Sequence, residues 1–343
     1  MYDLSKVVVT SSPHIKSDED TRSIMLDVII AMIPALAVGI FTFGPRALVL
    51  TCIAVISCIV FEFAYNKLLH QEVTVGDLSA VVTGMLLAYN IPVSAPWWLP
   101  VFGSLFAIVI TKMLFGGLGR NFMNPALAGR AFLMASWPGL MTTWTAVGAK
   151  LPLFGTLSGD DIKAISSATP LSVMKVATQG GATLPDASLI DALLGQIGGC
   201  LGETSALALL AGGLYLLYRK VITINIPAAY ILTVAVLTFI FPLNGADRVQ
   251  WMLYEVLSGG LFLGAIFMAT DYTTSPVTPK GQIVFGIGCG LLTVFIRYFG
   301  GLPEGVSYSI LIMNTLVWAI DKKTRPRIFG YAAKADKKKE AKA

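Results

Sequence analysis

The residues best suited to chemistry are hydroxyls in a polar segment near the middle of the chain. Residues 160–171 read Asp-Asp-Ile-Lys-Ala-Ile-Ser-Ser-Ala-Thr-Pro-Leu, which places Ser166, Ser167 and Thr169 among small residues and a proline. A hydroxyl in such a setting is sterically open, and its loop can enter the active site of another enzyme. Clusters of Ser, Thr, Ala and Pro are also ordinary loop chemistry. Composition alone therefore leaves a modification site and a plain loop both open.

Charged residues that interrupt apolar stretches form a second group of candidates. They are Glu62, Lys112, Arg130, Glu203, Glu255 and Asp271. A charge at the centre of a bilayer costs about 2.5–3.5 kcal/mol and indicates a functional site. We expect Glu62, Lys112 and Asp271 to reach a membrane interface. Glu203 lies in the middle of a long apolar stretch, so Glu203 and Asp271 are our candidates for an ion path. Lys112 or Arg130 could instead offset the negative charge of a bound group, and packing against a buried acid explains these two residues equally well.

The elements that carry these residues are predicted to be membrane-spanning helices. Apolar residues make up 55% of the 343 residues and charged residues 13%, about half the charge of a soluble globular chain. A bilayer core needs roughly 20 apolar residues per helix. The sequence predicts an all-α integral membrane protein of about ten transmembrane helices, over 24–43, 46–65, 78–92, 97–116, 123–138, 189–218, 223–242, 251–270, 281–299 and 303–320. The third and fifth stretches are short and rich in Gly, Asn or Pro, which favours broken or re-entrant helices there.

The distribution of Lys and Arg predicts the orientation. With both termini in the cytoplasm, the inside segments hold eight of these residues before the final helix and nine in the tail, against six on the outside. This asymmetry follows the positive-inside rule. The first residues are polar without an apolar core, so no removable signal peptide is expected. We therefore predict a multi-pass protein of the bacterial cytoplasmic (inner) membrane, with a basic tail that serves topology rather than nucleic-acid binding.

One membrane domain is expected, interrupted by a long loop. Its parts are a cytoplasmic segment 1–23, a first transmembrane half 24–138, an extracytoplasmic loop 139–188, a second transmembrane half 189–320 and a basic cytoplasmic tail 321–343. The segments 76–80 (Gly-Asp-Leu-Ser-Ala) and 202–206 (Gly-Glu-Thr-Ser-Ala) are similar. Five predicted helices precede the loop and five follow it, which is compatible with an inverted repeat of five plus five helices.

Several runs of this sequence resemble one family of membrane redox proteins. Ser-Ser-Ala-Thr-Pro-Leu at 166–171 resembles the flavinylation sequence of the RnfD and NqrB families. Residues 12–34, 115–126 and 303–308 are similar to runs that RnfD proteins carry. Ser167 stands where the family often has Gly, and Lys163 stands near where it usually has an acid. The second departure leaves the role of that acid open. The chain length and short amino terminus favour the RnfD type.

The resemblance implies two flavins. Thr169, with Ser166 and Ser167 in its motif, would carry FMN through a phosphoester bond in an extracytoplasmic loop. Asn121 and Asn124 would contact a second, noncovalent flavin, a riboflavin, as an Asn pair does in the NqrB relatives. Amide side chains both donate and accept hydrogen bonds, which suits the edge of a flavin ring. Helix capping by these asparagines is the competing interpretation.

The resemblance also implies a function. The chain would be the flavin-carrying transmembrane electron-transfer subunit of an Rnf-type complex, which couples ferredoxin and NAD redox chemistry to Na⁺ or H⁺ translocation. Its partners would be the other Rnf subunits, a flavin transferase and membrane lipid, with no nucleic acid. The dehydrogenase site is expected on other subunits, and neither a catalytic nor a metal-binding residue is expected here. The alternatives are a small-solute channel or secondary transporter with inverted repeats, and a scaffold subunit without a cofactor.

Overall fold

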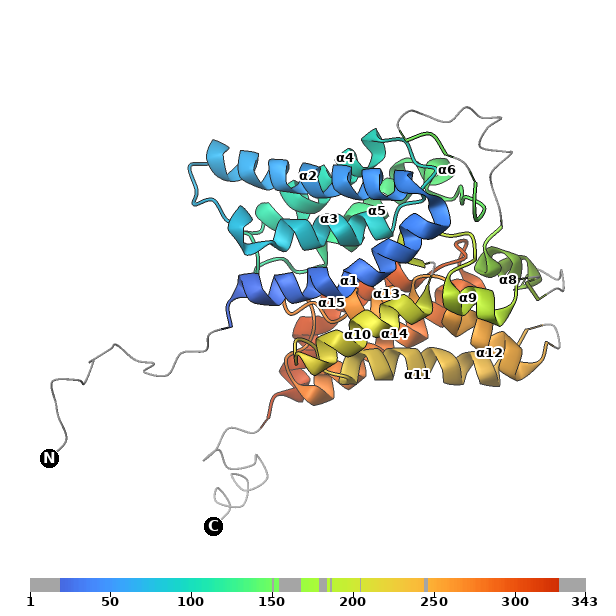
Figure 1. The fold of residues 1–343 in the computed structure, drawn as a ribbon. Helices are drawn as coiled ribbons and strands as arrows, with labels where there is room; N and C mark the ends of the chain where they lie inside the picture. Colours follow the sequence, from blue (N-terminus) through green and yellow to red (C-terminus); the bar gives the residue numbers. More distant parts are fainter. Residues whose placement is uncertain are drawn as a thin grey trace, which may run out of the picture.

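The computed structural model describes residues 19–149, 151–153, 168–178, 184–185, 187–203, 205–243 and 246–326. These residues form a bundle of helices that lie roughly along one direction (Figure 1). No β-strand occurs among them, and the only strand-like pairings there are isolated bridges from Pro92 to Cys200 and from Thr145 to Gly199. The predicted all-α fold is confirmed for this part of the chain.

The first half of the bundle begins with two long helices joined by a tight turn. A capping box of Asp20 and Ser23 starts the first helix, and Gly44 separates it from the second with a φ of +82° that favours glycine. The elements of this half are α1 (Thr21–Phe43), α2 (Pro45–Leu68), the 3-10 turn η2 (Val75–Asp77), α3 (Ser79–Tyr89), α4 (Trp98–Leu105), the π-helix η3 (Phe106–Met113), α5 (Pro125–Ser136) and α6 (Pro138–Met141).

The second half contains more interruptions. Its elements are α8 (Pro170–Thr178), α9 (Leu189–Leu194), the 3-10 turn η4 (Leu201–Glu203), α10 (Ala206–Tyr218), α11 (Asn225–Ile240), α12 (Arg248–Leu257), α13 (Leu261–Leu263), the π-helix η5 (Gly264–Met268), α14 (Pro279–Phe299) and α15 (Val306–Thr324). Most of the predicted loop 139–188, including Ser166 and Ser167, and most of the predicted tail 321–343 lie outside the described residues.

The length and composition of the helices suit a membrane protein. Three of the described helices, α1, α2 and α14, are long and apolar enough to span a bilayer, and a fourth span results if α12 and the segment Leu261–Met268 count as one bent helix. Four shorter apolar helices cover 79–89, 98–113, 206–218 and 225–240. Large apolar side chains such as Phe41, Leu232 and Phe295 face outward. The number of about ten spans stays a prediction.

Two of the predicted continuous helices are broken. Over 189–218, α9 ends at Gly195, which has a φ of +97°, and α10 begins only after Ser205. The expectation that Glu203 lies in the middle of a helix is therefore wrong, because Glu203 ends the 3-10 turn between α9 and α10. Over 251–270, the chain bends by 59° between α12 and the helix that begins at Leu261. Glycine hardly changes a hydropathy profile, yet each glycine weakens a helix by about 1 kcal/mol relative to alanine.

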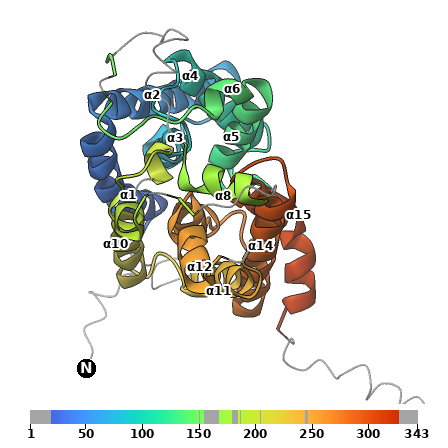
Figure 2. The same ribbon diagram turned by 90° about the vertical axis from the view of Figure 1, so that its right-hand side faces the viewer.

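Two sets of helices lie side by side, α1–α5 and α10–α15, with α8 between them at one end of the bundle (Figure 2). In the first set α2 packs against α3 and α4; in the second, α11 packs against α12 and α14. If α2 is matched with α11 on the basis of these packing partners, then α12 with η5 corresponds to α3, and α10 corresponds to α1. The similar segments that begin at Gly76 and Gly202 precede α3 and α10, so they do not mark equivalent positions.

The two sets meet where α1 packs against α10 and where α5 packs against α15. At the first contact a Cβ on Gly212 would overlap the Ala31 carbonyl, so the two backbones touch there. Asp27 of α1 accepts hydrogen bonds from the Tyr215 hydroxyl at 2.8 Å and from Arg219 Nε at 3.0 Å. Backbone contact and polar side chains thus join the two sets along this seam.

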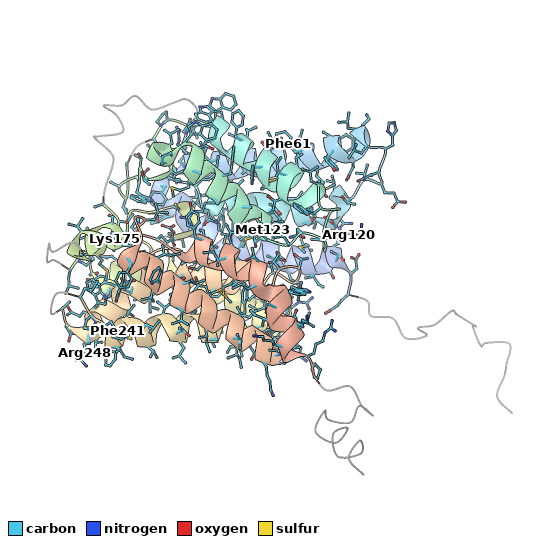
Figure 3. The ribbon with its side chains drawn as sticks, turned by 180° about the vertical axis from the view of Figure 1, so that it is seen from behind. Phe61, Arg120, Met123, Lys175, Phe241 and Arg248 are labelled. Carbon is cyan, nitrogen blue, oxygen red and sulfur yellow. The ribbon has the colours of Figure 1, made fainter. Side chains whose placement is uncertain are left out.

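The two ends of the bundle differ. The start of α1 and the end of α15 lie at one end, together with the segment that precedes α5, whereas α8 lies at the other (Figure 1). In Figure 3, Arg120 marks the first end, and Lys175 and Arg248 mark the second. The residue next to Arg120 is Asn121, so the two predicted flavin positions belong to opposite ends.

Candidate functional site

Thr169 is the residue that precedes α8 and caps it. Its Oγ1 accepts a hydrogen bond from the Ser172 amide at 3.1 Å, and its carbonyl accepts one from the Ser172 hydroxyl at 2.7 Å. The Thr169 side chain is only 7% exposed, so the expectation of an open, exposed hydroxyl is wrong for this conformation. The proline at 170 fixes the first helical position after the cap, which explains why the helix begins here.

Thr169 lines a cleft between the two sets of helices, which we call the Thr169 cleft. It holds about 510 Å³ of empty space, including its open mouth. Its walls come from α5, the segment after α6, the start of α8, the connection between α9 and α10, the α12–α13 break and the segment before α15, and they include Arg130, Glu203, Gly259 and Glu304. Six separate segments of the chain thus converge around one hydroxyl.

Arg130 is the charged centre of this cleft. Its Nη1 donates to Asn90 Oδ1 at 2.9 Å and to Ser307 Oγ at 2.6 Å. Its Nη2 donates to Glu304 Oε2 at 2.7 Å and lies 3.4 Å from Glu203 Oε1. Glu304 also accepts from the Gly260 amide. One guanidinium therefore ties α5 to the second set of helices and holds two carboxylates in an apolar interior.

A second cleft opens at the other end of the bundle, and we call it the Asn121 cleft. It holds about 750 Å³ of empty space with its mouth, and Asn121, Asn124, Lys112 and Asp271 line it. Asn124 is the cap of α5, because its Oδ1 accepts from the amides of Ala126 and Leu127 at 3.0 and 3.3 Å. The capping interpretation is therefore right for Asn124.

Asn121 differs from Asn124 because it caps no helix. Its Nδ2 donates to the Met123 carbonyl and to Thr273 Oγ1, both at 3.1 Å. Its Oδ1 is buried and has no hydrogen-bond partner. An unpaired buried acceptor costs about 1–3 kcal/mol, so a ligand that donates an N–H to Asn121 would relieve a deficit.

Asp271 follows η5 and lies beside Asn121. Its carboxylate accepts from the hydroxyls of Thr273 and Thr274 at 3.2 Å, and Thr273 also accepts from Asn121. The Asp271 carboxylate does not need a bound cation as a partner, because two hydroxyl groups already donate hydrogen bonds to it. The assignment of Asp271 to an ion path stays a prediction.

The expectation that Glu62 and Lys112 reach a membrane interface is wrong. Lys112 Nζ lies 2.6 Å from Glu62 Oε2, and the two side chains are 2% and 0% exposed, in that order. Lys112 also donates to Ser79 Oγ at 2.6 Å, and Thr74 Oγ1 donates to Glu62 Oε1 at 2.7 Å. Packing against a buried acid is thus confirmed for both Lys112 and Arg130.

Breaking this pair from one side is expected to destabilise the fold. Lys112→Met leaves Glu62 charged and unpaired, at a cost of about 3 kcal/mol, whereas the double variant Glu62→Leu with Lys112→Met removes both charges and costs less. Thermal unfolding in detergent, followed by the loss of the monodisperse chromatographic peak, measures both. A double variant less stable than the single one would contradict a compensated pair.

A third buried pair lies near α8. Arg297 Nη1 contacts Glu255 Oε2 at 2.7 Å, and Lys175 of α8 donates to the Arg297 carbonyl at 2.6 Å. Burial lowers the pKa of the Lys175 ammonium from its ordinary value, while the negative charge of Glu255 opposes that shift. Lys175 thus fastens α8 to the end of α14.

The two clefts approach each other along α5. Ala126 lines the Asn121 cleft and Arg130 lines the Thr169 cleft. These residues are four apart in one helix, on the same face and about 6 Å apart along the axis. One turn of α5 therefore separates Ala126 in the wall of one cleft from Arg130 in the wall of the other.

Residues 8–330 match the family described as NQR2, RnfD, RnfE. The chain belongs to this family. It is 51% identical over 339 residues to the RnfD-type subunit of the Na⁺-translocating ferredoxin:NAD⁺ oxidoreductase complex of Acetobacterium woodii, with 98% of both chains covered. It is 42% identical to the same subunit of the proton-translocating complex of Clostridium ljungdahlii, over 94% of this chain and 96% of that one. The corresponding subunit of the ion-translocating oxidoreductase complex of Escherichia coli is 37% identical, with 94% and 98% covered.

The buried ion pairs that Glu304 and Arg297 form were not predicted from the sequence. Glu304 falls in a run that resembles the family, but its pairing with Arg130 could not be foreseen from a separation of 174 residues. Arg297 is one of the six Lys and Arg residues predicted on the outside. The one available signal was its place near the end of an apolar helix that carries no other charge after Lys280.

Proposed function

We propose that this chain is the membrane-embedded, flavin-carrying electron-transfer subunit of an ion-translocating ferredoxin:NAD oxidoreductase complex. The relatives named above are RnfD-type subunits of such complexes. The observation that carries the electron-transfer role is the pair of clefts near opposite ends of the bundle whose walls come within one turn of each other along α5. Other subunits of the complex would exchange electrons with each end.

The Thr169 cleft suits a tethered FMN. The Thr169 hydroxyl lies on the cleft wall beside the start of a helix, and the cluster of Arg130, Glu203 and Glu304 lines the same space. A flavin bound there would supply the one- and two-electron redox chemistry, while the protein supplies position and electrostatics. Attachment requires a flavin transferase to reach Thr169. We therefore expect Thr169 to become exposed while the transferase is bound and to be buried before and after that step.

The Asn121 cleft suits a noncovalent riboflavin. Asn121 Oδ1 is an acceptor without a partner, and a flavin ring carries one N–H on its polar edge. The remaining walls are mostly apolar, from α1, α3, α10 and η5, which suits the dimethylbenzene part of the ring. Electrons would then pass along α5 over a short gap instead of crossing about 30 Å of hydrocarbon in one step.

Asn121→Leu is expected to weaken the binding of noncovalent flavin about tenfold, because one hydrogen bond in an apolar cleft is worth roughly 1–1.5 kcal/mol. Quenching of riboflavin fluorescence during titration of the purified protein measures the affinity. Asn225→Leu is the matched control, since Asn225 bonds Gln282 on α14, away from the cleft. Equal affinities for wild type and Asn121→Leu would argue against this site.

The proposed function is tested by the mass of the chain itself. The complex is purified from cells that also make the flavin transferase, and the denatured chain is separated from the other subunits. We expect flavin fluorescence in its gel band and an intact mass that exceeds the sequence mass by one esterified FMN. A colourless chain with the sequence mass would refute the flavin-carrying role.

The choice between Na⁺ and H⁺ stays open, since the complex of Acetobacterium woodii is named for Na⁺ translocation and that of Clostridium ljungdahlii for proton translocation. Glu203 is held beside Arg130, so as an ion-path residue it would act only when this contact loosens.

The matching packing order of the two sets of helices also suits a small-solute transporter with inverted repeats. Uptake of solute by vesicles without any redox partner would favour that second function. The cytoplasmic location of both termini, in the bacterial inner membrane, belongs to the same proposal.

A further inference from the structure

Arg297 is a buried cation with unused hydrogen-bonding capacity. Its side chain is 2% exposed, and Nη1 donates to the carbonyl and the carboxylate of Glu255. Nε and Nη2 have no partner. A guanidinium has five N–H donors and no acceptor, and leaving such donors unpaired in an apolar interior costs about 1–3 kcal/mol. A missing acceptor is therefore expected beside Arg297.

Nη2 of Arg297 lies beside the wall of the Thr169 cleft, although Arg297 itself is not one of the lining residues. Gly259 lines that cleft, and a Cβ added to it would lie 3.4 Å from Arg297 Nη2 and 3.3 Å from Glu304 Oε1, and would overlap the Leu171 side chain. Gly259, which has no side chain, is thus the wall residue next to the unpaired Nη2. Ser258, the neighbour of Gly259, also has a buried hydroxyl without a partner.

The start of α8 faces the same space. Thr169 caps this nine-residue helix, and Thr169, Pro170 and Leu171 line the cleft. Pro170 has no N–H, and the amides of Ser172 and Val173 donate to Thr169, so this turn offers an anion the Leu171 amide and the helix dipole. Arg130, the arginine in the cleft wall, already contacts four oxygen atoms. Arg297, beside the wall, has unpaired donors instead.

We propose that Arg297 and the first turn of α8 bind the phosphate that links FMN to Thr169. This inference rests on the proposed function. Arg297 is a positioning residue: it fixes the phosphodiester, and thereby the ring, without taking part in electron transfer. Its positive charge also stabilises the negative charge that the flavin gains on reduction.

The first test compares Arg297→Gln, Arg297→Lys and wild type in the purified complex, after the mass of each chain has verified attachment of flavin. Arg297→Gln is expected to lower the fluorescence anisotropy of the attached flavin, because the phosphate is no longer held, and Arg297→Lys to restore part of it. Arg248→Gln is the control, since Arg248 is exposed at the start of α12 at the same end (Figure 3). Unchanged anisotropy in Arg297→Gln would overturn the proposal.

The second test uses the sign of the charge. Arg297→Gln should lower the midpoint potential of the attached flavin, whereas Glu255→Gln, which removes the neighbouring negative charge, should raise it. A merely loosened structure would move both potentials in the same direction, and that result would overturn the proposal. If Arg297→Gln does not fold, the neutral double variant with Glu255→Gln removes the unpaired charge, and its potential should lie between those of wild type and Arg297→Gln.

An unmodified Thr169 in the wild type would refute the proposed function and this inference together. A modified Thr169 whose anisotropy and potential do not respond to Arg297 would refute the inference alone.

Discussion

Thr169→Val is expected to abolish covalent flavin in this chain completely while leaving a folded protein. Valine keeps the shape of threonine and removes the only atom of that side chain that can form an ester. The variant also loses the bond from Oγ1 to the Ser172 amide, and the loss of such a helix cap costs about 1 kcal/mol. That is too little to unfold a bundle of this size. Gel fluorescence and intact mass measure the flavin, and chromatography in detergent measures folding.

Two further variants separate attachment from structure. Thr169→Ser keeps a hydroxyl and should retain some flavin, whereas Ser172→Ala removes a neighbouring hydroxyl of the same turn and should retain flavin in full. Covalent flavin that survives in Thr169→Val would move the attachment site to another residue.

Arg130→Ala is expected to have the largest effect on stability of any single change in the described residues. The substitution leaves Glu203 and Glu304 unpaired in an apolar interior and deprives Asn90 and Ser307 of a donor. Removing one partner of a buried ion pair costs about 3–5 kcal/mol, and here two acids lose the same partner. We expect at least about 5 kcal/mol and little recoverable protein.

The comparison for Arg130 is Arg219→Ala. Arg219 also pairs with an acid across the two sets of helices, Asp27, but its side chain is 44% exposed, so water takes over much of its role and a small effect is expected. Arg130→Lys should recover part of the stability, since a lysine restores the charge but cannot reach four acceptors at once. Equal yields and melting temperatures for Arg130→Ala and Arg219→Ala would disprove the central role of Arg130.

The long helices could be predicted well because continuous hydropathy is a strong signal over 20 residues. The predicted stretches 24–43, 46–65 and 281–299 correspond to α1, α2 and α14 within a few residues. The breaks after Gly195 and at Gly259 were missed, because glycine hardly changes a hydropathy average although it favours left-handed turns. The short helices α3 and α5 were expected at the stretches rich in Gly, Asn or Pro.

The candidate sites could be predicted one residue at a time but not as groups. Asn121 and Asn124 were predicted as a pair of amide side chains that could contact a flavin. Only the folded structure shows that Asn124 caps a helix and that the Asn121 Oδ1 has no hydrogen-bond partner. The burial of Glu62 with Lys112 was missed because neither periodicity nor spacing reports a contact across 50 residues. The predicted roles of Ser166 and Ser167 concern residues outside the described part of the chain.

The seam between α1 and α10 limits how this protein can work. Where Gly212 rests on the Ala31 carbonyl, no layer of side chains separates the helices to ease a sliding movement, and Asp27 holds Tyr215 and Arg219 farther along the same line. A rocking motion of one half past the other would have to pull two main chains apart. If this chain couples redox chemistry to ion movement as we propose, we expect small, local rearrangements that leave this seam intact.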